Sequence, residues 1–214
     1  MVAVDLRGHG RSGWEPPWDL QTHVDDLLET VDSLGIERAD WVGHSFGGRL
    51  VIELATRAPY RVERAVLLDP AVWVPPPIAL DRSNDYREDH SFASVQEAID
   101  VRRETAQLAP PGMLEEEMEL HLFEDEDGRW RYRYSQSAVV AAFGEMSKPP
   151  PLDGLADIPT LIARAPAAEI CPDAIVEACR HAMANVEVVD LPGGHIVMWD
   201  ALDETADAVA RFLG

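Results

Sequence analysis

The chain has 214 residues, of which 46% are hydrophobic, and this is enough apolar material for one globular domain with a real core. Its formal net charge of −21 argues against nucleic acids and anionic membranes as partners, because both would repel it. The sequence contains neither a membrane-spanning run of about 20 apolar residues nor a charged-then-apolar leader, so a cytoplasmic protein is expected.

The first third of the chain alternates apolar and amphipathic segments. Residues 2–5 predict a short strand, and residues 19–34 carry apolar side chains at close to helical spacing. The apolar segments 39–42 and 65–69 predict strands on either side of a helix over 49–57. Strands that alternate with helices in this way predict an α/β fold with a mostly parallel sheet flanked by helices.

Two proline tracts, at 75–77 and 149–151, bracket a segment that is richer in charged and aromatic residues. We expect residues 75–157 to form an inserted, mainly helical cap or lid, and residues 1–74 and 158–214 to form the α/β core. Within the segment, a capping box at Ser94 and the apolar spacing predict helices over 94–108, 111–123 and 136–146, with a short strand over 130–134.

The last quarter of the chain returns to the α/β alternation. The pattern predicts a strand over 159–163, a helix over 172–183, a strand over 186–190 and a final helix over 201–213. The only two cysteines, Cys171 and Cys179, have a spacing that fits no metal site. We therefore expect buried or half-buried free thiols, and no metal or other cofactor.

The sequence GHSFGG at 43–48 sets Ser45 between two glycines, after an apolar strand and before a helix. This is the context in which G-x-S-x-G forms a nucleophile elbow. In such a tight turn, a side chain at Gly43 or Gly47 is expected to collide with neighbouring backbone. Ser45 would stand at the N-terminus of the helix, where the helix dipole favours developing negative charge.

A serine hydroxyl becomes a nucleophile when a base removes its proton, and the base needs an acid to hold its tautomer. His195 is the best candidate for the base, because it follows two glycines in a loop directly after a predicted strand. Two acids remain open, Glu169 and Asp69, and each follows a predicted sheet strand. We favour Glu169, which lies nearer the final loop, whereas Asp173 is better explained as a helix N-terminal charge.

Four stretches of the chain resemble, in order, the motifs of the α/β-hydrolase superfamily in its serine esterase and lipase-like type. They are VDLRGHGRS at 4–12, GHSFGG at 43–48, IPTLI at 158–162 and Gly194-His195. The resemblance covers essentially the whole chain. It implies a Ser-acid-His order of catalytic residues and a backbone N–H of Phe46 that serves as one donor of the oxyanion hole. The chain departs from the family in its acid loop, where Ala165 replaces a common glycine and Glu169 a usual aspartate.

A second departure concerns the beginning of the chain. The family begins with further strands and a His-Gly loop that supplies the other oxyanion donor, and the sequence before residue 2 has no room for them. We therefore expect the natural gene product to be longer, with Met1 as an internal methionine or a misassigned start.

The resemblance implies a serine hydrolase that cleaves a carboxylic ester or related acyl substrate, a small molecule, through an acyl-enzyme. Thioester, lactone and carbon–carbon bonds remain open as targets. The aromatic residues Trp73, Trp130, Tyr132 and Tyr134 either shape the acyl or alcohol pocket or serve as plain packing. The alternative is a non-catalytic binding protein, or an inactive truncated fragment, that keeps the same fold.

Overall fold

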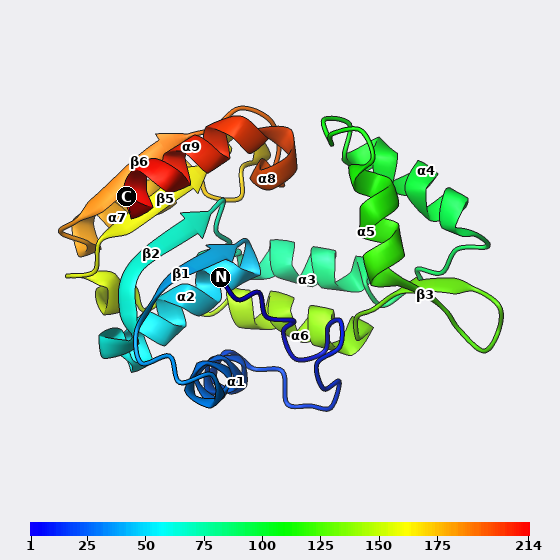
Figure 1. Cartoon of the computed structure of the whole chain (residues 1–214), viewed down its shortest axis with the longest axis horizontal. Helices are drawn as coiled ribbons and strands as arrows, with labels where there is room; N and C mark the ends of the chain where they lie inside the picture. Colours follow the sequence, from blue (N-terminus) through cyan, green and yellow to red (C-terminus); the bar gives the residue numbers. More distant parts are fainter.

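A four-stranded parallel sheet forms the centre of the protein in the computed structural model, which describes residues 1–214 (Figure 1). The strands lie in the order β1-β2-β5-β6, and each neighbouring pair is parallel. Their bounds are β1 Ala39–His44, β2 Val62–Leu68, β5 Thr160–Arg164 and β6 Val186–Asp190. Because all four strands run the same way, their carboxyl ends meet at one edge of the sheet, where the following loops gather.

Helices cover both faces of this sheet, as the sequence predicted. One face packs against α1 (Leu20–Ser33), α2 (Phe46–Arg57) and α7 (Asp173–Ala182), and the other against α8 (Val197–Asp200) and α9 (Leu202–Leu213). Successive strand residues point to opposite faces. Leu67 accordingly belongs to the α1, α2 and α7 side of the core, and its neighbour Val66 to the α8 and α9 side. No helix of the protein has both the length and the apolar character needed to cross a membrane.

Residues 75–157, which we call the inserted segment, lie between β2 and β5 in the chain and extend to the right of the sheet in Figure 1. Their elements are α3 (Pro76–Asp85), α4 (Val95–Thr105), α5 (Met113–His121), β3 (Leu122–Glu124), β4 (Trp130–Tyr132) and α6 (Gln136–Met146). The predicted helices and the strand near 130–134 are present, whereas α3 and β3 were not predicted. Ser94 caps α4 as expected, accepting a hydrogen bond from the backbone N–H of Glu97 at 3.1 Å.

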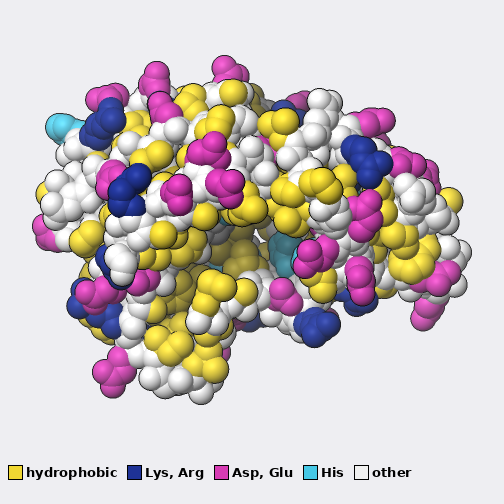
Figure 2. Space-filling model, turned by 45° about the horizontal axis from the view of Figure 1, so that its top comes forward, with side chains coloured by type: hydrophobic (Ala, Val, Ile, Leu, Met, Phe, Trp, Pro, Cys, Tyr) yellow, Lys and Arg dark blue, Asp and Glu magenta, His cyan; other side chains and the backbone are white.

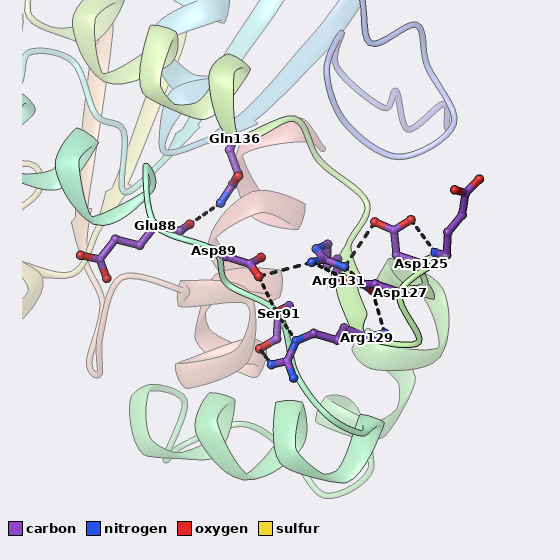
Figure 3. Close-up of polar contacts among 9 residues, drawn as sticks. Glu88, Asp89, Ser91, Asp125, Asp127, Arg129, Arg131 and Gln136 are labelled. Atoms are coloured by element: carbon purple, nitrogen blue, oxygen red, sulfur yellow. Dashed lines mark hydrogen bonds and ion pairs between the residues drawn. The ribbon is translucent and has the colours of Figure 1, made fainter.

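Charged side chains fasten the β3–β4 hairpin to the chain between α3 and α4 (Figure 3). Arg131 on β4 donates to Asp127 in the hairpin turn at 2.8 Å and to Asp89 at 3.3 Å. Arg129 donates to the hydroxyl and the carbonyl of Ser91, the latter at 2.8 Å. The inserted segment is thereby tied together by contacts between parts that are distant in the sequence.

The strand predicted over residues 2–5 is wrong. In the structure these residues have no hydrogen-bonded strand neighbour, and a strand without a partner leaves its backbone groups unpaired. The loop that follows lies against the inserted segment instead: Gly10 N–H donates to the carbonyl of Arg133 at 2.7 Å, and Ser135 N–H to the carbonyl of Gly8 at 2.6 Å. β1 is consequently an edge strand, with the Val42 side chain half exposed.

Both cysteines are buried free thiols, which confirms the prediction for these residues. Burial is the main cause that raises the pKa of Cys171 to about 12 and the pKa of Cys179 to about 11. Both side chains therefore stay protonated at neutral pH and act as core residues.

Candidate active site

Ser45 occupies the sharp turn between β1 and α2. Its backbone has φ 53° and ψ −116°, a conformation that is costly for a residue with a side chain. A Cβ placed on Gly43 would lie 2.3 Å from the carbonyl oxygen of Gly47, so the turn requires glycine at position 43. Nothing lies within 4 Å of a Cβ at Gly47, so the expected collision there is wrong. Gly48 is the second crowded position, because its Cβ would lie 2.7 Å from Cβ of Pro70.

The neighbouring strand and the loop after it hold this turn in place. The N–H of Ser45 donates to the carbonyl of Leu68, the last residue of β2, at 3.1 Å. The carbonyl of Ser45 accepts from the N–H of Ala71 at 3.0 Å and from that of Gly48 in α2, also at 3.0 Å. A strained backbone of this kind costs on the order of 1–3 kcal/mol, which these bonds offset. They fix the hydroxyl of Ser45 at the carboxyl edge of the sheet.

Three side chains from separate loops form one continuous hydrogen-bonded chain at this edge. His195 Nε2 lies 2.9 Å from Ser45 Oγ, and His195 Nδ1 lies 2.7 Å from Asp69 Oδ2. Asp69 follows β2 directly, has φ 36° and is fully buried. Its other oxygen accepts the backbone N–H of Ala165 at 3.1 Å. Asp69 can therefore hold the proton on Nδ1 and leave Nε2 free to accept the proton of the serine.

The loop that carries His195 is fixed from two sides. Gly193, with φ 86°, makes the turn, and the N–H of Gly194 donates to a carboxylate oxygen of Asp200 at 2.8 Å. On the other side, His44 Nε2 lies 2.8 Å from the carbonyl oxygen of His195, and the two rings are 4.6 Å apart. Burial lowers the pKa of His44. A neutral His44 that carries its proton on Nε2 donates to this carbonyl.

The prediction that Glu169 orients His195 is wrong, because the structure brings Asp69 to that ring. Glu169 lies after the short helical turn Pro166–Ala168, where its side chain is exposed to solvent and makes no hydrogen bond or ion pair. Asp173 begins α7 and pairs with Arg164 at 2.6 Å, in agreement with its interpretation as a helix N-terminal charge. The useful signal in the sequence was an aspartate that directly ends a fully apolar strand.

Phe46 directly follows Ser45, the N-cap residue of α2. It is the first residue of α2, so its N–H has no acceptor within the helix and lies at the positive end of the helix dipole. The Phe46 ring meets the buried His23 ring edge-on at 5.4 Å, which holds the start of α2 in place. The N–H of Phe46 makes no hydrogen bond within the protein.

A cavity of about 690 Å³ lies between the inserted segment and the chain around Asp5, His9 and Gly10. The space-filling view shows a hollow near the centre of the molecule (Figure 2). Tyr132 and Tyr134 line this cavity. Trp130 instead packs against the apolar cluster of the inserted segment, and Trp73 donates its ring N–H to the carbonyl of Ser147 at 3.1 Å. Of the four aromatic residues that the sequence left open between pocket and packing, Tyr132 and Tyr134 line the cavity, Trp130 serves packing, and Trp73 stays 37% exposed. No group of three or more His, Cys, Asp or Glu side chains is arranged to hold a metal ion.

Comparison with known proteins places this geometry in context. A family model described as the alpha/beta hydrolase family matches residues 1–208. Lipase LipV of Mycobacterium tuberculosis is 30% identical over 223 aligned positions, which cover 100% of this chain and 83% of that protein. Esterase YbfF of Escherichia coli is 31% identical over 140 positions, 62% of this chain and 51% of the relative. The crystal structure of an E-2-(acetamidomethylene)succinate hydrolase superposes with a TM-score of 0.85 at 22% identity, covering 98% of this chain and 79% of the other.

Proposed function

Because this chain belongs to the alpha/beta hydrolase family, we propose that it is a serine hydrolase that cleaves a carboxylic ester or related acyl substrate. The observation that carries the proposal is the chain of hydrogen bonds from Ser45 Oγ to His195 Nε2 at 2.9 Å and from His195 Nδ1 to Asp69 Oδ2 at 2.7 Å. Similarity to a lipase and an esterase supports the acyl chemistry. In this proposal Ser45 is the nucleophile, His195 the general base and Asp69 the acid that orients it.

The first half of the reaction forms an acyl-enzyme. Ser45 Oγ attacks the substrate carbonyl carbon while His195 Nε2 takes the hydroxyl proton, and the carbonyl π electrons move to the oxygen. Asp69 stabilises the imidazolium formed at His195, because its buried carboxylate accepts the Nδ1 proton. When the tetrahedral intermediate collapses, the bond to the leaving group breaks and Nε2 gives its proton to the departing oxygen.

The second half repeats these steps with water. His195 Nε2 removes a proton from a water molecule, whose oxygen attacks the acyl carbon. The bond to Ser45 Oγ then breaks, and the oxygen takes the proton back from Nε2. The carboxylic acid leaves and the free serine is restored.

The oxyanion of each tetrahedral intermediate needs hydrogen-bond donors. In this proposal the N–H of Phe46 supplies one, assisted by the positive end of α2. Removal of a single such donor typically reduces kcat by about 10²–10³-fold. In this proposal the inserted segment acts as a cap, because Arg102 of α4 lies with its guanidinium carbon 5.0 Å from the ring centre of Trp199 in α8, the helix that follows the His195 loop.

A fluorophosphonate probe tests the proposal, since it phosphonylates only a serine that is activated by a base. We expect a mass increase on a peptide that contains Ser45, and loss of labelling in Ser45→Ala. The exposed hydroxyl of Ser137 provides a matched control, and Ser137→Ala should label like the wild type. A folded protein whose Ser45 does not react, and which hydrolyses no ester of a set of increasing acyl length, would refute the function.

A further inference from the structure

Arg49 is a buried charged residue that the proposed triad does not use. It lies in the first turn of α2, close after Ser45, and its side chain is 1% exposed. A guanidinium group that is removed from water needs acceptors for its N–H groups, because a buried charge without partners is strongly unfavourable. Glu53 is one partner: it accepts from Nε at 2.9 Å and lies 2.8 Å from Nη2. The remaining acceptors are backbone carbonyls.

These carbonyls belong to the two stretches of chain that connect the inserted segment to the core. Nη1 donates to the carbonyl of Val72 at 2.7 Å and to that of Lys148 at 3.0 Å, and Nη2 donates to that of Pro149 at 3.2 Å. Val72 lies on the outgoing stretch, residues 70–75, which leads to α3. Lys148 and Pro149 lie on the returning stretch, residues 147–151, which follows α6. One side chain therefore binds both stretches at once.

The two stretches are also joined to each other directly, at a junction that we call the root of the inserted segment. The N–H of Val74 donates to the carbonyl of Met146 at 3.0 Å, and the ring N–H of Trp73 donates to that of Ser147 at 3.1 Å. From the root, α3 and α6 extend side by side away from the sheet (Figure 1). The hydrogen bonds of Arg49 thus set the direction in which the inserted segment leaves the core.

The outgoing stretch also holds the turn of the proposed nucleophile. The N–H of Ala71 donates to the carbonyl of Ser45 at 3.0 Å, and the backbone N–H of Arg49 donates to the same carbonyl at 3.3 Å. Ala71 and Val72 are both buried. The Ser45 turn and the Arg49 side chain therefore bind neighbouring residues of one stretch, so the root is fixed relative to the serine.

We propose that Arg49 is a positioning residue that fixes the inserted segment relative to Ser45 and thereby controls the binding of long acyl chains. The proposal rests on the proposed function, in which the inserted segment acts as a cap. A long acyl chain extends from the reacting carbon to the inserted segment, whereas an acetyl group ends close to Ser45. Loss of the Arg49 side chain should weaken binding of the long chain and leave the triad intact, because the hydrogen bonds of His195 do not involve Arg49.

The kinetics of two p-nitrophenyl esters, the acetate and the octanoate, test this role. Arg49→Met removes every donor of the side chain, and Glu53→Gln in the same protein avoids an unpaired carboxylate. We expect this double variant to raise KM for the octanoate about tenfold, the typical effect of losing hydrogen bonds of a charged group, and to keep kcat/KM for the acetate within about threefold. A purely structural role would lower Tm and affect both esters alike.

A conservative variant and a matched control accompany this measurement. Arg49→Lys keeps the positive charge beside Glu53, but its single nitrogen cannot reproduce the forked contacts with three carbonyls. It should raise KM for the octanoate by about threefold, less than the double variant does. Arg57→Met is the control, because Arg57 lies in the last turn of the same helix and pairs with Asp25 at the surface. It should leave both esters unchanged.

The result that overturns this role is separate from failure of the proposed function. If fluorophosphonate labels Ser45, but KM for the octanoate is unchanged in the Arg49 variants or both esters lose activity equally, Arg49 does not position the inserted segment and the hydrolase stands. If the double variant does not fold, Arg49→Lys alone decides by the same comparison. A wild-type protein whose Ser45 stays unlabelled and which hydrolyses neither ester refutes the proposed function, and this role with it.

Discussion

Replacement of Asp69 by asparagine should abolish most of the activity while leaving the shape of the site intact. The amide oxygen of the new side chain can still accept the N–H of Ala165, which donates to Asp69 at 3.1 Å in the native protein. The amide NH₂ would then face Nδ1 of His195 at the position where a carboxylate oxygen now lies 2.7 Å away. Because an amide nitrogen only donates, it forces the His195 proton onto Nε2, and Nε2 can no longer accept the proton of Ser45.

The expected loss is large because the tautomer and the imidazolium charge both depend on this one buried carboxylate. A wrong tautomer in a triad of this geometry lowers kcat by about 10⁴-fold, which corresponds to roughly 5.5 kcal/mol of transition-state stabilisation. We expect Asp69→Asn to lower kcat/KM for a p-nitrophenyl ester by about 10³–10⁴-fold. Its far-ultraviolet circular dichroism should remain that of the wild type.

The matched control is Glu169→Gln, which also neutralises one carboxylate in a loop at the same edge of the sheet. Glu169 is exposed and has no partner, so its removal should change kcat/KM by less than about twofold. Activity that survives in Asp69→Asn but is lost in Glu169→Gln would refute the reasoning. It would return the acid to the position that the family pattern favours.

Three further outcomes are expected. Gly43→Ala should lower the free energy of unfolding by about 1–3 kcal/mol, because the new Cβ would lie 2.3 Å from the carbonyl oxygen of Gly47. Gly47→Ala has open space around its Cβ and should leave Tm within about a degree or two of the wild type. Equal melting curves for the two variants would contradict this reasoning. His44→Met should lower kcat about tenfold, because it removes the 2.8 Å hydrogen bond to the carbonyl of His195. His44→Gln should keep most of the wild-type kcat, since the glutamine amide can donate to the same carbonyl. Equal kcat values for the two variants would argue against this hydrogen bond as the cause. The hydrogen-bonded ion pair with Arg131 lowers the pKa of Asp127 from 3.8 to about 2, so the stabilisation that the pair gives is present above pH 3.8 and is lost as the pH falls toward 2. Asp127→Asn should therefore flatten the decrease of Tm between pH 4 and pH 2. An unchanged slope would show that the pair contributes nothing.

Local patterns in the sequence were enough to predict most elements of the fold. The helix Gln136–Met146 has the predicted bounds, and α1 begins after Asp19, whose side chain accepts the N–H of Thr22 at 2.9 Å. The elbow around Ser45 and the loop with His195 were recognisable for the same reason. Capping, helical periodicity and glycine turns depend on residues close together in the chain, so a single sequence carries them.

Only the tertiary structure decided which acid meets His195 and which residues line the cavity. Glu169 and Asp69 both follow sheet strands, and the sequence gives no measure of where each side chain points. The order β1-β2-β5-β6 sets Asp69 directly after β2, the strand next to the one that ends just before Ser45. Asp69 is buried there, with its carboxylate 2.7 Å from the His195 ring, while a further turn carries Glu169 into solvent. Contacts between side chains more than a hundred residues apart depend on strand order and packing, and these are properties of the whole fold.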